Sequence, residues 1–387
     1  MRDLAPRLAQ LKSKSLYRQR LTLDSPQDTH VIIDGQQLIS FCSNDYLGLA
    51  NHPAVIDAFK QGAQQYGVGS GASHLVSGHS HAHHELEAAL AAFVGHPRAL
   101  LFSSGYMANL AVQTTLAARH DVIYQDRLNH ASLIDAAQLS KASLQRYAHL
   151  DSVALTKRLD DSEISDDKNS LIVSDGVFSM DGDIAPLPEL VSIAKRHRSL
   201  LIIDDAHGIG VLGKNGRGSL EHFNINHSDE IILVGTLGKA FGTFGAFVAA
   251  SEDIIETLIQ KGRSYIYTTA LPPAVACATL ASLKIIQQDN ARREKLAELI
   301  VYFKTSAAQI QLPLMPSTTA IQPLLIGDAA QALSMSQALR EQGFLIAAIR
   351  PPTVAEGSAR LRITLSANHC HEDIDVLLVA LSKFIVR

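Results

Sequence analysis

The chain has 387 residues, which is enough for two or three packed domains at about 150 residues each. Hydrophobic residues make up 47% and charged residues 19%, which excludes a disordered or fibrous polymer. The 34 Lys and Arg against 38 Asp and Glu give a formal net charge of -4, so no basic field attracts nucleic acid or an anionic membrane, and we expect small-molecule chemistry.

In chain order, the N-terminal residues predict an amphipathic helix and then a short β segment over His30 to Phe41, and we expect residues 1–45 to form an N-terminal arm. From about residue 97 to 250, short apolar runs alternate with longer amphipathic stretches, which is typical of βαβ units. Runs such as SLLIIDD lack period-two alternation, as expected of parallel strands that helices cover on both faces. The runs that predict strands are Ala99 to Phe102, Val122 to Tyr124, Ser170 to Val173, Leu200 to Asp204, Ile231 to Val234 and Gly245 to Ala249.

Beyond Leu271, two prolines begin a helical stretch that reaches about Gln287, and the charged helical pattern ARREKLAELIVYFKTSAAQ follows. We therefore expect an α/β fold: a large domain with a mostly parallel central sheet over 46–288 and a smaller α+β C-terminal domain over 289–387. The last part of the sequence predicts strands near Ala320 to Leu325, Leu345 to Ile349 and Arg360 to Thr364, and helices over Gln331 to Gln342 and Glu372 to Phe384.

The three cysteines, Cys42, Cys277 and Cys370, lie far apart and indicate neither a disulfide framework nor a thiolate metal site. The N-terminal stretch MRDLAPRLAQLKSK contains no apolar core of a signal peptide, and the most apolar later stretch, LPPAVACATLASL, is too short to span a bilayer. We therefore expect a cytoplasmic protein without a membrane segment.

Polar residues follow several predicted strands directly, and in an open parallel sheet ligands bind at this edge. Ser103, Ser104, Gly105 and Tyr106 follow the first run and precede a helical pattern, so their backbone N–H groups and the helix dipole can bind a phosphate. An ordinary strand-to-helix turn has the same residue types.

Asp204 and His207 lie at the end of the fourth run, and Lys239 lies between glycines just past the fifth. An ammonium next to an apolar interior is poorly solvated, which favours the neutral amine that forms a Schiff base. Each feature alone also fits turn chemistry or an exposed lysine. Together with a phosphate cradle they match pyridoxal phosphate (PLP): a lysine binds its aldehyde, and an aspartate keeps its ring nitrogen protonated so that the ring can take up carbanion charge.

Two loops offer further contacts to such a cofactor. Asn129-His130-Ala131-Ser132 follows the second run, so the imidazole of His130 can stack on the pyridine face. The segment SDGVFSMDGD begins at Ser174, directly after the third run. Either segment alone also fits a polar loop over a strand end.

Seven motifs, in order, resemble the α-oxoamine synthase family of fold-type-I PLP enzymes over almost the full chain: FCSNDYLGLANHP, GVGSGASHLVSG, SSGYMAN, LNHAS, SDGVFSMDGDIAPL, IDDAHGIGVLGKNGRG and TLGKAFG. The resemblance implies an aspartate aminotransferase-like fold, a homodimer with the site at the subunit interface, and PLP as cofactor. It implies that Lys239 forms the Schiff base and acts as the catalytic base, and that Asp204 pairs with the pyridinium nitrogen. The other implied cofactor contacts are stacking by His130, ring-oxygen contacts by His207 and Ser179, and phosphate contacts by the Gly105 and Tyr106 backbone and the Thr236 hydroxyl.

The C-terminal segments AIRPPTV and ARLRITL resemble the biotin-pathway member of the family. In that member a threonine at the Thr353 position and an arginine of the N-terminal arm contact substrate; alignment without gaps selects Arg18, with Arg20 as the alternative. Arg362 is expected to bind the amino acid carboxylate, since a guanidinium suits bidentate pairing. The resemblance implies decarboxylative condensation of L-alanine with a pimeloyl thioester, carried by coenzyme A or an acyl carrier protein, to 8-amino-7-oxononanoate.

Two other functions stay open on the sequence. One is the reaction of the related 2-amino-3-ketobutyrate ligase, which condenses glycine with acetyl-CoA. The other is a nucleotide-binding or scaffolding α/β protein without catalysis, which leaves Lys239, Asp204, His207 and Ser179 without a shared role.

One region departs from the family pattern. Many relatives have arginine after GSGGS, whereas this chain has His74 after GSGAS, so we expect a different acyl pocket. The residues His79, His81, His83, His84 and Glu85 that follow have metal-ligating side chains. The spacing of the next apolar residues, Leu86, Leu90 and Phe93, instead indicates the first turn of an amphipathic helix ending at Gly95. No cysteine or distant carboxylate completes a site, so we expect no metal.

Overall fold

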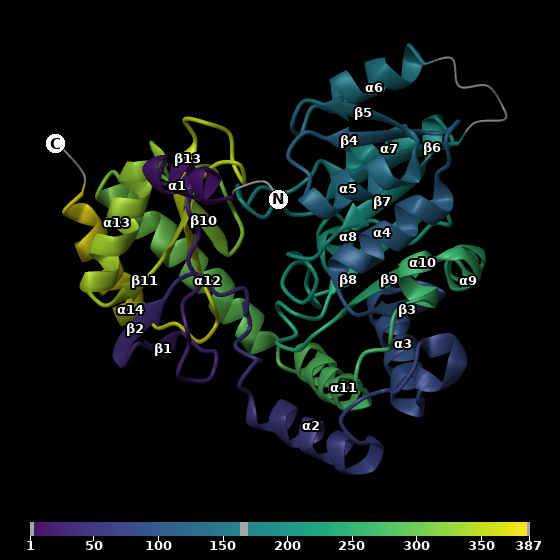
Figure 1. Cartoon of the computed structure of the whole chain (residues 1–387), viewed down its shortest axis with the longest axis horizontal. Helices are drawn as coiled ribbons and strands as arrows, with labels where there is room; N and C mark the ends of the chain where they lie inside the picture. Colours follow the sequence, from purple (N-terminus) through teal and green to yellow (C-terminus); the bar gives the residue numbers. More distant parts are fainter. Residues whose placement is uncertain (1–3, 163–168, 385–387) are drawn as a thin grey trace. The chain divides into compact units, whose positions relative to one another are not determined.

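The computed structural model describes residues 4–162 and 169–384, which form two compact units (Figure 1). The larger unit comprises residues 52–178 and 184–290. The smaller unit comprises the chain up to residue 51, the short segment 179–183 and the chain from residue 291 onward. The N-terminal residues therefore pack in the same unit as the C-terminal ones.

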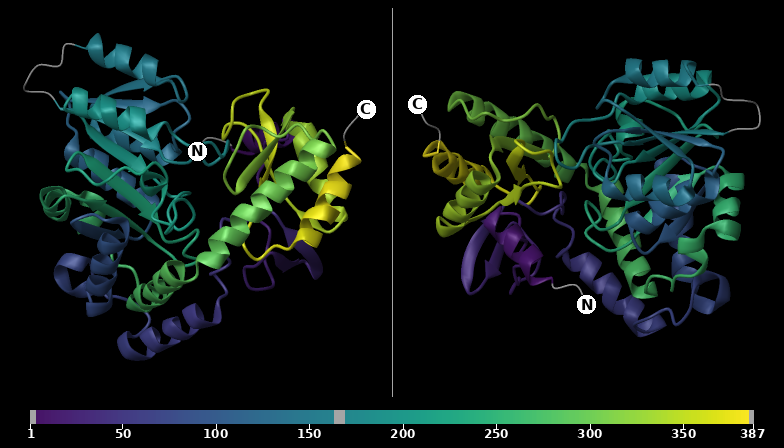
Figure 2. Two further views of the ribbon diagram at one scale, coloured as in Figure 1. Left: turned by 180° about the vertical axis from the view of Figure 1, so that it is seen from behind. Right: turned by 45° about the horizontal axis from the view of Figure 1, so that its top comes forward.

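A seven-stranded sheet forms the centre of the larger unit, and Figure 2 shows it from two further directions. Six strands run in the same direction, and β9 is antiparallel to both of its neighbours. Every residue of β6 and β9 is buried, which explains why their sequences lack the alternation of apolar and polar residues. In sheet order the strands are β3 (Arg98–Phe102), β9 (Ala246–Ala250), β8 (Ile231–Thr236), β7 (Leu200–Asp204), β6 (Ser170–Asp175), β4 (Val122–Asp126) and β5 (Ser143–Tyr147).

The helices of the larger unit begin at residues that satisfy their free N–H groups. The Ser104 hydroxyl accepts a hydrogen bond from the N–H of Met107, and the Asp151 carboxylate accepts one from Ala154. Buried side chains of α4, α5 and α9 pack with those of the sheet in one hydrophobic core. The helices are α2 (Pro53–Tyr66), a π-helix η1 (His74–Gly78), α3 (His81–Val94), α4 (Gly105–Leu116), α5 (Ala131–Ser140), α6 (Ser152–Asp160), α7 (Leu187–Arg196), α8 (Ser219–His222), α9 (Glu252–Lys261), α10 (Arg263–Ile266) and α11 (Pro273–Gln288).

The smaller unit contains two three-stranded sheets. In the first, β1 (His30–Ile33) and β2 (Gln36–Ser40) form a hairpin, and β11 (Phe344–Leu345) pairs with β2 in parallel. The hairpin turn is Asp34-Gly35, where both residues have positive φ, as a type I′ turn requires. The second sheet has the order β10 (Ile321–Gly327), β13 (Ala359–Thr364), β12 (Ala347–Ile349). The helices are α1 (Ala5–Ser13), α12 (Asn290–Gln309), α13 (Ala329–Glu341) and α14 (His371–Ser382).

The predicted fold class is confirmed: a mostly parallel central sheet accompanies an α+β unit. The β segment predicted over His30 to Phe41 is present as a hairpin. The strand predicted over Leu345 to Ile349 is wrong as a single strand, since the segment divides between two sheets. The edge strand β5 was not predicted. The domain limits 1–45, 46–288 and 289–387 stay a prediction. Among the described residues, no helix combines the length and apolar character needed to cross a membrane.

Candidate active site

Lys239 and His207 meet at the carboxyl edge of the central sheet. Lys239 follows β8 and His207 follows β7, and these two strands pair in parallel. The parallel pairing brings the two turns to the same edge, where Lys239 Nζ lies 2.9 Å from His207 Nε2. The two side chains are therefore neighbours, and their roles toward a cofactor stay a prediction.

The carboxylate of Asp204, the last residue of β7, is held from both sides. Its Oδ2 accepts a hydrogen bond of 2.6 Å from Asn109 Nδ2, and its Oδ1 accepts one of 3.1 Å from the N–H of Ala206. Asn109 lies one turn into α4 and also donates to Ser132 Oγ at 2.9 Å. Because Asp204 and Asn109 are 6% and 1% exposed, the carboxylate is fixed in a nearly water-free position.

His130 is locked in orientation by its own helix. It is the N-cap residue of α5, and its Nδ1 accepts a hydrogen bond from the N–H of Ser132 and lies 2.7 Å from Ser132 Oγ. Its backbone N–H donates to Asp175 Oδ2 at 2.7 Å. Burial lowers the pKa of His130, and the nearby Asp204 opposes this effect. The side chain is therefore a neutral, flat imidazole, which suits stacking on an aromatic ring.

The start of α4 presents backbone donors. Gly105 and Tyr106 are its first two residues, and N–H groups at this position have no partner within a helix. A Cβ added at Gly105 would meet nothing within 4 Å, so the approach to these N–H groups is open. The phenol of Tyr106 donates to the Asp135 carboxylate of α5. The Thr236 hydroxyl, at the end of β8, accepts from the N–H of Gly238 at 3.3 Å and donates to the Gly245 carbonyl at 3.2 Å.

A second carboxylate, Asp205, lies directly behind this edge and is fully buried. Its Oδ2 accepts a 2.7 Å hydrogen bond from the N–H of Ser219. A Cβ at Gly208 or Gly218 would lie within 2.1 Å of an Asp205 oxygen, so only glycine fits at these positions. Burial raises the pKa of Asp205 to about 7, with the negative charge of Asp204 as a smaller contribution.

In the smaller unit, Arg362 lies on β13 with its guanidinium surrounded by neutral groups. Its Nε donates to the Ser179 carbonyl at 2.6 Å, its Nη1 and Nη2 donate to Asn44 Oδ1 at 3.2 and 3.1 Å, and its Nη1 also donates to Thr364 Oγ1 at 3.0 Å. Arg360, two residues earlier on the same strand, instead forms a 2.7 Å ion pair with Asp181. No protein anion neutralises the charge of a guanidinium whose partners are neutral, so this group can bind the anion of a ligand.

Arg18 and Thr353 come together from opposite ends of the sequence within the smaller unit. Arg18 Nη2 donates to Thr353 Oγ1 at 3.3 Å. Arg350 lies close by, donating to the Ser15 carbonyl, and burial and the positive charge of Arg18 lower its pKa. Of the two arginines that the sequence left open, Arg18 is the one in contact with Thr353.

The larger unit thus brings together Lys239, His207, Asp204 and His130. Thr236 ends β8, just before Lys239, and Gly105 and Tyr106 begin α4, which also carries the Asn109 partner of Asp204. Ser179, Arg362, Arg18 and Thr353 belong to the smaller unit, so their roles toward a cofactor or substrate stay predictions. No role was predicted from the sequence for Asn109, Ser132 or Asp175. A signal was present for Asn109, since an amide four residues after Gly105 on a helix faces the same side.

These residues fit PLP. An amine lies beside an imidazole, a fixed carboxylate can hold a ring N–H, a flat neutral imidazole can stack, and an open helix start can bind phosphate. The fold and this set of groups define a PLP-dependent enzyme of fold type I.

The comparisons with known proteins identify the family. The family Aminotransferase class I and II matches residues 36–381. The chain is 57% identical over 381 residues to the 8-amino-7-oxononanoate synthase of Pseudomonas putida (strain GB-1), covering 98% of this chain and 97% of that protein. The corresponding synthase of Thioalkalivibrio sulfidiphilus (strain HL-EbGR7) is 56% identical over 383 residues, covering 99% and 97%.

Two solved structures extend the comparison to the fold. A serine palmitoyltransferase from S. paucimobilis, with a bound PLP–myriocin aldimine, gives a TM-score of 0.92 at 31% identity over 98% of this chain and 96% of that chain. The 8-amino-7-oxononanoate synthase of Francisella tularensis gives 0.78 at 37% identity over 90% and 97%. The chain therefore belongs to the aminotransferase class I and II family and, within it, to the α-oxoamine synthases, which use PLP.

Proposed function

We propose that the protein catalyses the decarboxylative condensation of L-alanine with a pimeloyl thioester to 8-amino-7-oxononanoate, in biotin biosynthesis. The α-carbon of alanine bonds to the thioester carbonyl carbon, the alanine carboxylate leaves as carbon dioxide, and the thiolate leaves and takes up a proton. The observation that carries the proposal is the Lys239–His207 contact beside the fixed Asp204 carboxylate, in a chain 57% identical to a synthase of this name.

Bound PLP supplies an electron sink for negative charge at the α-carbon of the amino acid. The Asp204 carboxylate, fixed by Asn109 and Ala206, holds the proton on the ring nitrogen. Lys239 would hold the cofactor through Nζ, and the same amine would accept the α proton of the amino acid and donate a proton to that carbon after carbon dioxide has left. His207, 2.9 Å from Nζ, orients the amine for these transfers.

Three residues of the smaller unit are proposed to select the substrates. The guanidinium of Arg362, whose protein partners are neutral, receives the carboxylate of the amino acid. The hydrogen-bonded pair of Arg18 and Thr353 contacts the pimeloyl group. Condensation of glycine with acetyl-CoA is the competing reaction within the family, and relatives at 56–58% identity named as 8-amino-7-oxononanoate synthases favour the pimeloyl reaction.

We also propose that the enzyme works as a cytoplasmic homodimer, with the pimeloyl group delivered on coenzyme A or on an acyl carrier protein. Cys42, Cys277 and Cys370 are free thiols, which fits a reducing compartment. Light scattering of the purified protein with PLP tests the assembly: twice the chain mass supports the dimer, and a single chain mass contradicts it.

An assay of amino acids against thioesters tests the reaction. L-Alanine and glycine are each combined with pimeloyl-CoA, pimeloyl acyl carrier protein and acetyl-CoA, and release of free thiol and carbon dioxide is measured, with Lys239→Ala as the inactive control. We expect kcat/KM to be highest for alanine with a pimeloyl thioester, by at least about tenfold, the size of effect that one selective contact provides. Faster turnover of glycine with acetyl-CoA, or none with any pair, contradicts the proposal.

A further inference from the structure

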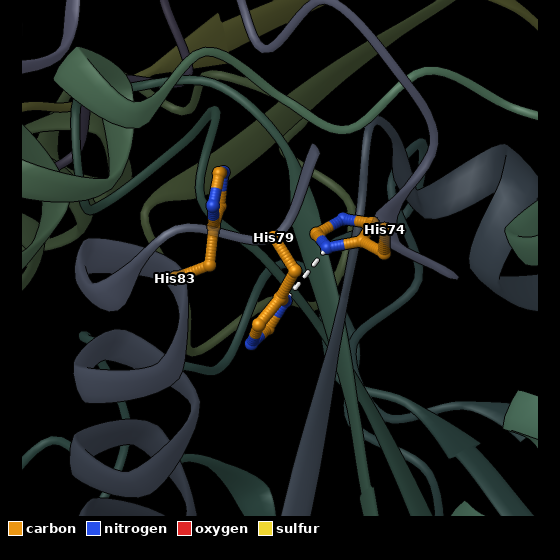
Figure 3. A group of neighbouring side chains, drawn as sticks. All are labelled: His74, His79 and His83. Atoms are coloured by element: carbon orange, nitrogen blue, oxygen red, sulfur yellow. Dashed lines mark hydrogen bonds between the residues drawn. The ribbon is translucent and has the colours of Figure 1, made fainter. Parts of the chain in front are cut away.

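Three histidines of the larger unit gather near the start of α3 (Figure 3). His74 begins η1, His79 follows that helix, and His83 lies in the first turn of α3. One nitrogen of each ring lies within 4.8 Å of the corresponding nitrogens of the other two, and the Nδ1 atoms of His74 and His79 are 2.9 Å apart. The sequence favoured the first turn of a helix over a metal site, because no cysteine or distant carboxylate completes a ligand set; in the structure His74 joins two histidines of the run.

One of the rings already has the outer partner that orients metal-bound histidines. The Nε2 of His83 lies 2.7 Å from the Leu271 carbonyl, and donation to that oxygen leaves Nδ1 as the lone-pair nitrogen. Histidine ligands in proteins usually donate their second N–H to a backbone carbonyl or a carboxylate. The Nε2 of His79 lies 4.0 Å from a carboxylate oxygen of Glu87, which is beyond hydrogen-bond distance.

The rings are also held in place. His74 stacks on Tyr265 with ring centroids 5.1 Å apart and planes 11° apart. His83 closes the capping box of α3, where its Nδ1 accepts a hydrogen bond of 3.0 Å from the N–H of Ser80. Binding a cation through this nitrogen requires release of that hydrogen bond. His74 and His79 are therefore the primary ligand pair, and His83 is the more costly third ligand.

We propose that His74, His79 and His83 bind one divalent transition-metal ion of the zinc type, with a fourth position open to water. Zn–N bonds of about 2.0–2.1 Å in a tetrahedral site separate the nitrogens by about 3.4 Å, so a pair within 4.8 Å closes by at most about 1.4 Å on binding. Side-chain rotation of His74 and His79, which lie outside regular α-helix, provides this movement. The ion connects η1 to the start of α3.

Calorimetric titration of ZnCl₂ into the full-length, tag-free PLP enzyme tests the site, after treatment with a chelator and dialysis. We expect one Zn²⁺ per chain with submillimolar affinity, and at least about a hundredfold loss in His74→Gln and in His79→Gln, since loss of an outer partner alone costs about 10–100-fold. His81→Gln is the matched control, because His81 lies on α3, as His83 does, but outside the cluster. Its side chain is 70% exposed and lies 3.2 Å from Glu85.

Only variants with the PLP content and the thermal unfolding midpoint of the wild type are compared. Differences in zinc affinity then come neither from misfolding nor from zinc bound to the cofactor. Cobalt provides a second readout, since tetrahedral Co²⁺ gives a visible absorption that the two ligand variants are expected to lack. Equal zinc affinity in wild type and both ligand variants, an equal loss in His81→Gln, or the absence of a submillimolar site in the wild type overturns the proposal.

Discussion

Replacing Asn109 by alanine removes the donor that fixes the Asp204 carboxylate. The lost contact is a 2.6 Å hydrogen bond from Asn109 Nδ2 to Asp204 Oδ2, made between side chains that are almost completely buried. Hydrogen bonds to charged groups contribute about 1.5–3 kcal/mol, which corresponds to about 10–150-fold in an equilibrium constant. Because Asp204 is proposed to hold the proton on the cofactor ring, we expect PLP affinity and kcat/KM to fall by a factor in this range.

The assay is a titration of the apoenzyme with PLP, followed by visible absorbance, together with steady-state kinetics. Asn109→Asp is expected to bind PLP more weakly than Asn109→Ala, since it places a second carboxylate against Asp204. Gln113→Ala is the control: Gln113 is buried one turn further along α4, where its Oε1 accepts a 2.9 Å hydrogen bond from Gln125. We expect it to lower stability and leave PLP affinity unchanged. Wild-type PLP affinity and kcat/KM in Asn109→Ala would refute the role of this hydrogen bond.

Three further predictions concern the substrates and pH. In steady-state kinetics, Arg18→Ala is expected to raise KM for the pimeloyl thioester at least about tenfold and to leave KM for alanine unchanged. Arg20→Ala is the control and is expected to stay close to wild type. Equal effects of the two changes contradict the assignment of Arg18. Arg362→Gln is expected to raise KM for alanine at least about tenfold, and an unchanged KM contradicts carboxylate binding. The pKa of Asp205 is raised from 3.8 to about 7, so its contribution to stability is present at low pH and is lost as pH rises through about 7. Calorimetry is therefore expected to show a smaller fall in the unfolding midpoint between about pH 5 and about pH 8 for Asp205→Asn than for wild type, and equal falls contradict this reasoning.

The central sheet was predictable because buried parallel strands have apolar runs without alternation. Strand β5, with the sequence SLQRY, was missed because it lies at the sheet edge and only its last residue is buried. The segment from Leu345 to Ile349 gave one apolar signal, yet Phe344–Leu345 pairs with β2 while Ala347–Ile349 pairs with β13. A single sequence does not reveal such a change of partner, because both strands show the same local pattern.

Some residues of the site were likewise predictable from the local sequence, and others depend on tertiary contacts. Asp204 ends a parallel strand, and Lys239 and His130 lie within four residues of the ends of two others, so the rule for parallel sheets was enough to group them. Asn109 acts through a hydrogen bond across the sheet edge, and the preference for Arg18 comes from its contact with Thr353, 335 positions away in sequence. The histidine cluster likewise depends on the path of η1, which brings His74 to His79.

Chemical trapping of the cofactor on the protein tests the central claim most directly. The purified enzyme is loaded with PLP, reduced with borohydride, digested and mapped by mass spectrometry, with Lys239→Ala and Lys261→Ala treated in parallel. We predict one reduced cofactor per chain, carried by the peptide that contains Lys239, and its loss in Lys239→Ala alone. A cofactor found on another lysine, or none retained by the wild-type protein, would contradict the account.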